Sequence, residues 1–317
     1  RTDNLRALRA AALTANPLLD FEKLLVVRRK ANNLGMPCNW QSNSSIRKTG
    51  YDNEIATLSP VSPSGTLTTL FRPDKGEFVG DVALDYDAKK MLFSMPSNGG
   101  KRSWHVFEIN ADGTGLRQVT KTDGPQVNNY DACYLPDGRI LFCSTAPCVA
   151  VPCVRGSAPV ATLHRCGPNG ENMRQLAFDQ DHSWCPVIMA NGTVLYERWE
   201  YTDLPHSNSR ILFTMNPDGT NQRSFYGSNS YWPNSVFYAR PVPGSSTVFA
   251  GIVTGHHGPR RVGELVIFDA SMGSTEAEGA VQKIPGYGKQ VEAVIADRLT
   301  GGSWPKFLHP WPLSEKY

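Results

Sequence analysis

Asp81, Asp131 and Cys185 recur at matching positions of a repeated sequence unit, and His182 lies three residues before Cys185. Asn234 lies at about the matching position of the next unit. If each lies on the innermost strand of its unit, their side chains meet at a common centre. Carboxylate, thiolate and imidazole groups are donors that bind zinc and other divalent transition metals. The pattern predicts such a metal site. The alternative is that the aspartates only accept backbone hydrogen bonds where strands begin.

A pair of histidines, His256 and His257, is flanked by glycines that allow close approach to a ligand. Neighbouring residues in an extended segment point to opposite sides, so we expect one of the pair to face the same centre, with His257 slightly favoured. A surface pair without a role is the alternative. Arg260 and Arg261 follow and predict binding of a carboxylate or phosphate, or else the capping of a loop.

A further candidate set lies in a loop of the fourth unit. Asp203 and His206 are the candidate catalytic residues, His206 as general base or ligand and Asp203 as the carboxylate that orients it. A structural loop histidine is the alternative. Trp199, Glu200 and Tyr201 form a charged, aromatic edge that suits a sugar or another polar ring. Packing between units is the alternative for tryptophans on this side.

Several common catalytic motifs are missing. The sequence has no Gly-x-Ser-x-Gly, P-loop, dinucleotide-binding Gly-x-Gly-x-x-Gly or His-Glu-x-x-His. It also lacks Cys-x-x-Cys-His, so a bound haem would need another form of attachment than the usual c-type one. The mechanisms that depend on these motifs have no support in the sequence.

Short Asp-Gly and Asn-Gly turns indicate how these residues are positioned. Residues 110–114 (Asn-Ala-Asp-Gly-Thr) and 216–220 (Asn-Pro-Asp-Gly-Thr) each follow an apolar strand, and 167–170 (Gly-Pro-Asn-Gly) is a degenerate copy. Such dipeptides favour the turns that join antiparallel strands. The turns return about every 50 residues, and four short strands per unit are typical of a β-propeller blade. A β-sandwich with incidental turns is the alternative.

We therefore predict an all-β protein, a β-propeller of four-stranded antiparallel blades. Six blades are expected, of which this chain holds five and the start of a sixth. The five units cover approximately residues 21–72, 78–120, 128–178, 181–227 and 232–285, and the sixth begins in 290–317. An N-terminal segment, residues 1–20, carries a short helix over 2–15, which we expect to pack on the propeller rim. The propeller domain then covers 21–317.

The loops of such a propeller fall into two groups. The Asp-Gly turns open on one face, and the connections between second and third strands open on the other. That second, loop-rich face carries the unusual stretches, which are residues 36–43, 97–102, 143–155, 198–206 and 254–261. Because function concentrates on long loops held by a rigid scaffold, we expect the site there.

Composition excludes two classes of partner and leaves the cysteines open. The 317 residues carry a net charge of +3 without a basic block, so no nucleic-acid partner is expected. No apolar run is long enough to span a membrane. Seven cysteines is an odd count. In an oxidising compartment Cys143, Cys148 and Cys153 could supply a loop disulfide with one thiol left over, and in a reducing one they would be thiols or ligands.

Six segments together carry a family resemblance. They are residues 129–138 (Asn-Tyr-Asp-Ala-Cys-Tyr-Leu-Pro-Asp-Gly), 179–186 (Asp-Gln-Asp-His-Ser-Trp-Cys-Pro), 198–203 (Arg-Trp-Glu-Tyr-Thr-Asp), 227–234 (Gly-Ser-Asn-Ser-Tyr-Trp-Pro-Asn), 255–258 (Gly-His-His-Gly) and 284–289 (Ile-Pro-Gly-Tyr-Gly-Lys). Over nearly all of 17–317 the sequence resembles the hydrazine synthase alpha-subunit-like proteins of planctomycetes. More distantly, it is similar to TolB-type propellers, including oligogalacturonate lyases.

The resemblance implies a six-bladed propeller in a periplasmic or secreted protein, with a haem beside a zinc bound by Asp, Cys and His. By type and position these would be Asp81 or Asp131, Cys185 or a cysteine of the third unit, and His256 or His257. The sequence departs from the family in two respects. No tyrosine follows His257 where the family's haem ligand would lie, and the c-type haem domain is absent.

The leading prediction is therefore an extracytoplasmic propeller with a metal-supported site on its loop-rich face, part of a larger redox protein with a c-type cytochrome domain or subunit as partner. One alternative is a carbohydrate-active or carbohydrate-binding propeller. The other is a non-catalytic interaction module. The expected ligand is a small molecule or a glycan.

Overall fold

The computed structural model describes residues 2–97, 103–121, 126–200, 204–205 and 209–315. Its strands form antiparallel sheets that follow one another along the chain. The first sheet holds β1 (Leu24–Arg29), β2 (Asn53–Ser59) and β3 (Thr66–Phe71). The second holds β4 (Gly80–Leu84), β5 (Lys90–Pro96), β6 (Trp104–Asn110) and β7 (Arg117–Gln118). The third holds β8 (Asn129–Tyr134), β9 (Ile140–Ser144), β10 (Thr162–Cys166) and β11 (Arg174–Gln175).

The last two sheets complete the series. The fourth holds β12 (Ser183–Ile188), β13 (Val194–Trp199), β14 (Arg210–Met215) and β15 (Arg223–Tyr226). The fifth holds β16 (Ser235–Pro241), β17 (Val248–Thr254), β18 (Glu264–Asp269) and β19 (Ala280–Ile284). One parallel pair, Arg210 with Ser235, joins these two sheets.

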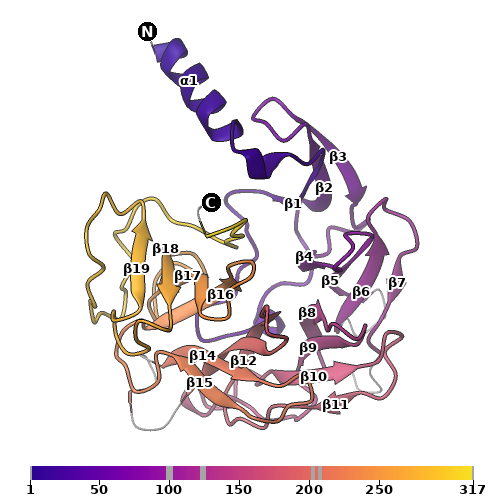
Figure 1. Ribbon diagram of the computed structural model, residues 1–317. Coiled ribbons are helices and arrows are strands. Elements are labelled where there is room, and N and C mark those ends of the chain that lie inside the picture. The colour runs from indigo at the N-terminus through magenta and orange to yellow at the C-terminus, as the bar shows by residue number, and fades with distance from the viewer. Residues whose placement is uncertain (1, 98–102, 122–125, 201–203, 206–208, 316–317) are drawn as a thin grey trace.

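The sheets are arranged in a ring (Figure 1). Strands β4, β8, β12 and β16 lie around its middle, and β7, β11, β15 and β19 lie on the outside. Each sheet falls within one predicted sequence unit. The predicted all-β class with four-stranded antiparallel sheets is confirmed.

The first sheet has three strands among the described residues, where four were predicted. Its long connection, residues 30–52, follows β1, and a short turn, residues 60–65, follows β2. In the second, third and fourth sheets the longest connection follows the second strand. By this match β1 corresponds to a second strand, and the innermost strand is missing from this sequence unit.

The stretch 290–317 was predicted to begin a sixth blade. In the described part of this stretch no regular strand forms, and Phe307 makes a single isolated bridge to Gly263. Pro305, Pro310 and Pro312 lack the N–H group that a strand ladder needs, which accounts for the irregular backbone. The segment lies in the opening between the first and fifth sheets (Figure 1).

The predicted turns form as their residue types require. Asp112 accepts hydrogen bonds from the backbone N–H of Thr114 at 2.9 Å and from its hydroxyl at 2.6 Å. Asp218 and Thr220 repeat this arrangement at 3.0 and 2.7 Å. The intervening Gly113 has a φ of 86°, which glycine adopts without steric cost. These turns hold the strand ends on the face opposite the long loops.

Each sheet buries its faces against its neighbours. Val106, Ile140 and Phe142 pack between the second and third sheets. Leu195, Val236 and Phe249 do the same between the fourth and fifth. Burial of these apolar faces stabilises the ring and provides a rigid frame for the loops.

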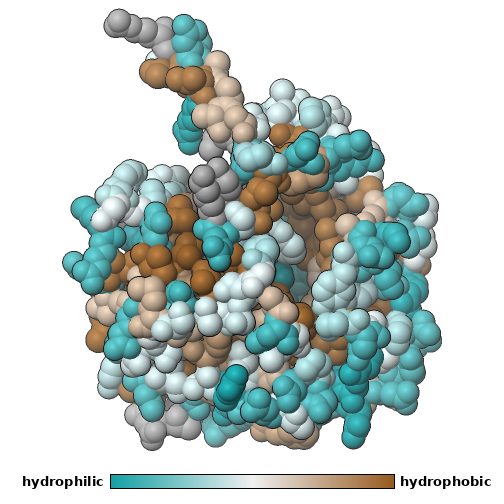
Figure 2. Space-filling view, viewed as in Figure 1, coloured by the Kyte–Doolittle hydropathy of each residue, from teal (hydrophilic) through white to brown (hydrophobic). Residues whose placement is uncertain are grey.

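The N-terminal helix α1 (Thr2–Thr14) forms as predicted but does not pack on the rim. It projects from the ring (Figure 1), and Leu5 and Leu8 are 65% and 67% exposed. Figure 2 shows brown hydrophobic atoms on the projecting helix. Among the described residues, no helix has both the length and the apolar character needed to cross a membrane.

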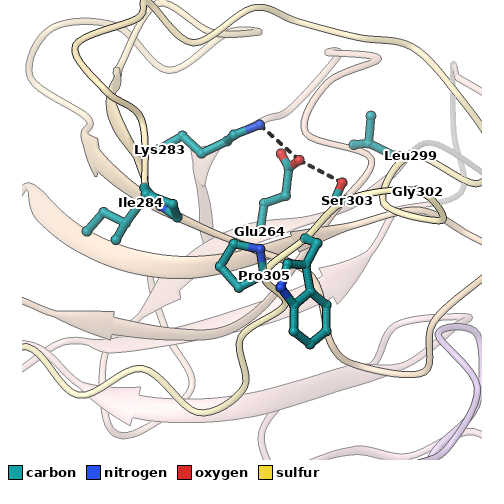
Figure 3. A pocket seen from close by; sticks show the side chains of 9 residues that line it. Glu264, Lys283, Ile284, Leu299, Gly302, Ser303 and Pro305 are labelled. Atoms are coloured by element: carbon teal, nitrogen blue, oxygen red, sulfur yellow. Dashed lines mark hydrogen bonds and ion pairs between the residues drawn. The ribbon is translucent and has the colours of Figure 1, made fainter. Parts of the chain in front are cut away.

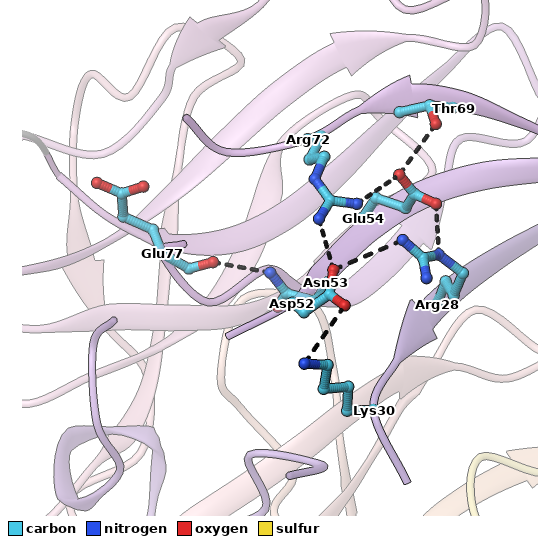
Figure 4. Close-up of polar contacts among 8 residues, drawn as sticks. All are labelled: Arg28, Lys30, Asp52, Asn53, Glu54, Thr69, Arg72 and Glu77. Carbon is cyan, nitrogen blue, oxygen red and sulfur yellow. Dashed lines mark hydrogen bonds and ion pairs between the residues drawn. The ribbon is translucent and has the colours of Figure 1, made fainter. Parts of the chain in front are cut away.

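A network of charges stabilises the first sheet (Figure 4). The buried Glu54 accepts hydrogen bonds from Arg28 Nε at 2.5 Å, Thr69 Oγ1 at 2.9 Å and Arg72 Nη1 at 3.3 Å. Arg72 also pairs with Asp52 at 2.5 Å. Burial alone would raise the pKa of Glu54, but the three hydrogen bonds outweigh it and lower the pKa. Glu54 therefore contributes stability as an ionised carboxylate.

We expect Glu54→Gln to lower the free energy of unfolding by about 1–3 kcal/mol at pH 7, because it weakens charge-assisted hydrogen bonds at a buried site. A carboxyl group with a lowered pKa stabilises the fold above its unfolded pKa and loses this effect as the pH falls through the folded value. The difference from wild type should therefore shrink below about pH 4. Urea unfolding of wild type and Glu54→Gln at pH 7 and below about pH 4 measures this difference in stability. Asp87→Asn, in an exposed pair with Lys89, is the control, and an equal loss there would contradict the prediction.

Candidate functional site

Four inner strands share one backbone irregularity. β4, β8, β12 and β16 each pair with the next strand through a shift of register. Within each shift one residue has a positive φ: Asp81 at 51°, Asp131 at 53°, Cys185 at 50° and Tyr238 at 54°. Non-glycine residues rarely adopt this conformation, and for a side chain as large as tyrosine it is an outlier. Strain that recurs at bulges is a feature of functional sites.

These half-buried side chains converge around the middle of the ring, and we call this group, with His309 described below, the axial site. Asp131 Oδ2 accepts a hydrogen bond from the backbone N–H of Cys185 at 2.8 Å. Cys143 Sγ lies 3.9 Å from the same oxygen. Tyr238 lies close enough to Asp81, Asp131 and Cys185 for their charges to affect its pKa. Three residues that the sequence aligned thus occupy one site.

The sequence alignment placed Asn234 at the matching position of the fifth unit, which was wrong by four positions. The matching position of the fifth sheet is Tyr238, and Asn234 is buried before the strand, where its carbonyl accepts from the N–H of Arg210. The fifth unit has a Pro-Gly-Ser-Ser turn instead of Asp-Gly, so the sequence offered no turn of the usual type for the alignment.

A fifth polar side chain, which sequence reasoning missed, comes from the C-terminal segment. His309 has a φ of 50°, and its ring centroid lies 4.2 Å from that of Tyr238. His309 is exposed, but partial desolvation in the site and the nearby Arg29 lower its pKa, so the ring is neutral at pH 7. The sequence did contain a signal for this residue, because His309 precedes a proline as Cys185 of the axial site does.

Burial controls protonation at the axial site. It raises the pKa of Asp131 to about 7, the nearby Asp81 adds to this, and the Cys185 N–H and Arg261 partly offset it. Burial also raises the pKa of Cys143 and of Cys185 well above the usual range. At neutral pH the thiols are therefore protonated, and Asp131 exchanges a proton readily. Asp131 is the group best suited to acid–base chemistry.

Three arginines supply positive charge. Arg29 Nη2 donates to the carbonyl of Val79 at 2.8 Å, and Arg261 Nη2 donates to the carbonyl of Gln41 at 2.6 Å. Burial lowers the pKa of Arg29 and of Arg240. Although burial opposes it, the neighbouring Tyr238, thiol and carboxyl groups raise the pKa of Arg261. The site therefore combines acidic and cationic groups.

Arg261 is held between aromatic rings. Its guanidinium lies 4.8 Å from the Trp184 ring centroid and 3.9 Å from that of Phe237. Nη1 lies 3.9 Å from Cys185 Sγ. This placement puts a fixed positive charge beside the thiol, and binding of a carboxylate or phosphate by Arg261 stays a prediction.

The other predicted metal ligands lie elsewhere. His182 is buried, its Nδ1 accepts from the N–H of Ala161 at 3.0 Å, and its ring stacks on Trp184. His256 contacts Arg210, and the exposed His257 pairs with Asp297 at 2.9 Å. Over the described ranges no three His, Cys, Asp or Glu side chains are arranged to hold a metal ion. With Arg261 beside Cys185, the described residues do not complete a three-ligand zinc set.

A buried carboxyl group lies behind the axial site. Neither carboxylate oxygen of Glu197 has a hydrogen-bond partner among the described residues. Burial raises the pKa of Glu197 well above its usual range, although Arg261 and Arg210 oppose this. Burial likewise raises the pKa of Asp181 to about 6. Sequence reasoning did not single out Asp181 as part of a site.

The candidate edge beyond β13 is partly outside the described residues, which exclude Tyr201, Asp203 and His206. Trp199 is 1% exposed, and its ring centroid lies 6.4 Å from that of Trp184. The guanidinium of Arg210 lies over the Trp199 ring, 4.5 Å from its centroid. The Trp199 ring therefore cannot offer its face to a sugar in solution. Glu200 is half-buried and pairs with Arg198 at 3.8 Å.

An exposed tryptophan lies instead beside a cavity of about 330 Å³ between the fifth sheet and the C-terminal segment (Figure 3). Trp304 is 87% exposed and lines it. Glu264 Oε1 accepts from Lys283 Nζ at 3.0 Å and Ser303 Oγ at 2.8 Å. Here an aromatic ring and a carboxylate combine as the glycan alternative requires.

The cysteines form no disulfide. All seven lie in the described part of the chain, and each is free. Cys143 is buried against Asp131, while Cys148 and Cys153 are exposed. The loop disulfide that an oxidising compartment would favour is therefore not formed in this structure.

Comparison with known proteins supports the fold. No protein-family model and no curated protein matches the chain. Among solved structures it is similar to Kuenenia stuttgartiensis hydrazine synthase, with a TM-score of 0.63 and 15% identity over 92% of this chain and 41% of that chain. For TolB from Acinetobacter baumannii the TM-score is 0.46, with 14% identity over 68% of this chain and 46% of that chain. For an oligogalacturonate lyase in complex with manganese the TM-score is 0.43, with 14% identity over 80% of this chain and 61% of that chain.

The likeness to hydrazine synthase shows the propeller fold, at an identity too low to show more. The chain spans less than half the length of that hydrazine synthase chain.

Proposed function

We propose that the chain is a ligand-binding β-propeller whose function resides at the axial site. The observation that carries this proposal is the positive φ repeated at Asp81, Asp131, Cys185 and Tyr238. Each such residue costs on the order of 1–3 kcal/mol, and the surrounding sheets must stabilise it. A polar or reactive side chain occupies every one of these positions, so the strain serves to present functional groups rather than to complete the core.

The groups at this site suit a small polar molecule. Arg29, Arg240 and Arg261 can hold an electron-rich group of the ligand, and Asp131 can donate or accept a proton beside it. His309, neutral at pH 7, supplies a further acceptor. The chemistry that this arrangement supports is proton transfer to or from a bound molecule.

A thermal-shift screen of small polar metabolites tests the proposal. We expect ligands that raise the melting temperature of wild type, and we expect the shift to be lost in Asp131→Asn and Cys185→Ser. Ser157→Ala, on an exposed loop residue, is the control for general effects of substitution. If every ligand found stabilises the axial variants as much as wild type, function does not reside at this site.

A metal centre in a haem-linked redox protein is the second candidate. The approach of Asp131, Cys143 and Cys185 favours it, although the described residues do not complete a three-ligand set. Elemental analysis and an absorption spectrum of protein purified without chelator decide between the two. About one zinc per chain, lost in Asp131→Asn, would favour the metal centre, and a haem band would add the redox function. If neither zinc nor a haem band is found, even after reconstitution, the binding of a small polar molecule remains the better account. An extracytoplasmic location and a cytochrome partner stay predictions from the resemblance.

A further inference from the structure

We infer that a second site, separate from the axial site, binds a small oxyanion in a cavity that Arg47 and Arg260 share. The cavity has a volume of about 740 Å³ and is lined by residues 31–38 and 45–47 together with Gln41, Tyr51, Arg260 and Val262. This volume lies within the range of about 300–1,000 Å³ that is usual for small-molecule sites.

The charges that line the cavity favour an anion. Arg47 and Arg260 are exposed, and neither forms an ion pair with a carboxylate among the described residues. No acidic side chain is among the described residues that line the cavity. A guanidinium group binds carboxylate or phosphate oxygens through two parallel hydrogen bonds, so two of them in one cavity suit a carboxylate or phosphate group.

A buried amide joins the two loops that carry these arginines. Asn39 is 2% exposed, and its Nδ2 donates to the carbonyls of Gly255 at 2.8 Å and Pro259 at 3.0 Å. Its Oδ1 accepts from the backbone N–H of Arg261 at 2.7 Å. Asn39 therefore joins the loop that carries Arg260 to the loop that lines the cavity. Beyond this joint, Arg261 reaches the axial site while Arg260 lines the cavity.

The wall of the cavity is also preformed. Gly35 has a φ of 67°, and a Cβ atom there would lie 2.7 Å from Tyr51 and 2.8 Å from Phe78. The backbone therefore packs directly on the aromatic pair Tyr51 and Phe78, whose centroids are 5.4 Å apart. A site that needs little reorganisation loses less free energy when its ligand binds.

Calorimetric titration of the full chain with inorganic phosphate, and separately with succinate, tests the inference. We expect saturable binding of one anion per chain, weakened about tenfold or more by Arg47→Met and by Arg260→Met. Asn39→Leu should weaken binding without removing a charge. Arg223→Met, an exposed arginine of β15 outside the cavity, is the matched control and should bind as wild type does. The tighter of the two probes identifies phosphate or carboxylate as the ligand group.

Two outcomes would overturn the inference. One is that neither probe binds, or that the two cavity variants bind no more weakly than Arg223→Met. The other is that Asp131→Asn removes anion binding, because the anion would then occupy the axial site. Circular dichroism of each variant shows whether the fold is retained. If no ligand of the axial site is found while the anion still binds in the cavity, the result would count against the proposed function alone.

Discussion

Asp131→Asn is expected to raise the free energy of unfolding by about 2–4 kcal/mol at pH 8 and to change it little at pH 4. The pKa of Asp131 is raised from 3.8 to about 7 in the folded protein, mainly by burial. The folded state then binds more protons than the unfolded state between these values, so stability falls as the pH rises through this range. An uncharged amide at this position avoids the cost of a buried charge, and asparagine tolerates a positive φ.

Melting temperatures of wild type and Asp131→Asn from pH 4 to pH 8 measure this effect. The difference between the two proteins isolates Asp131, because other groups that titrate in this range, such as Asp181 with its raised pKa and His309 with its lowered pKa, are common to both. Asp137→Asn is the control, since Arg139 lowers the pKa of that carboxyl group and the sign is opposite. If Asp131→Asn changed stability equally at pH 4 and pH 8, folding would not raise the pKa of Asp131, and its role as a proton-exchanging group would be wrong.

Trp184→Ala is expected to lower the free energy of unfolding by about 3–5 kcal/mol, the usual cost of removing a buried tryptophan. Trp184 is 2% exposed, its centroid lies 4.5 Å from that of His182, and it also supports Arg261. The same change should therefore weaken any ligand of the axial site, because the guanidinium loses one of the rings that hold it.

Urea unfolding of Trp184→Ala and of Trp304→Ala provides the comparison. Trp304 is 87% exposed, so its removal should change stability by no more than about 0.5 kcal/mol. Equal losses for the two variants would show that Trp184 does not stabilise the fold through packing. Trp184→Phe should recover part of the loss, because a smaller ring still fills part of the space.

Much of this architecture was predictable from local sequence. The strand and turn boundaries follow from Asp-Gly chemistry, as at Asp112 and Asp218, and from the repeat of about 50 residues. The same repeat placed Asp81, Asp131 and Cys185 at one position of three inner strands. Residues that occupy equal positions in equal units must meet in a ring, so their convergence is a property of the sequence pattern.

What the tertiary structure alone decided depends on contacts between distant segments. His309 reaches Tyr238 only because the C-terminal segment lies in the opening of the ring, and Trp199 is buried only because the neighbouring sheet covers it. Arg47 and Arg260 share a cavity because Asn39 joins their loops across the ring. A repeat predicts where each unit begins and which of its residues turn inwards. The irregular loops carry no such period, so only their packing in three dimensions determines which of their side chains come together.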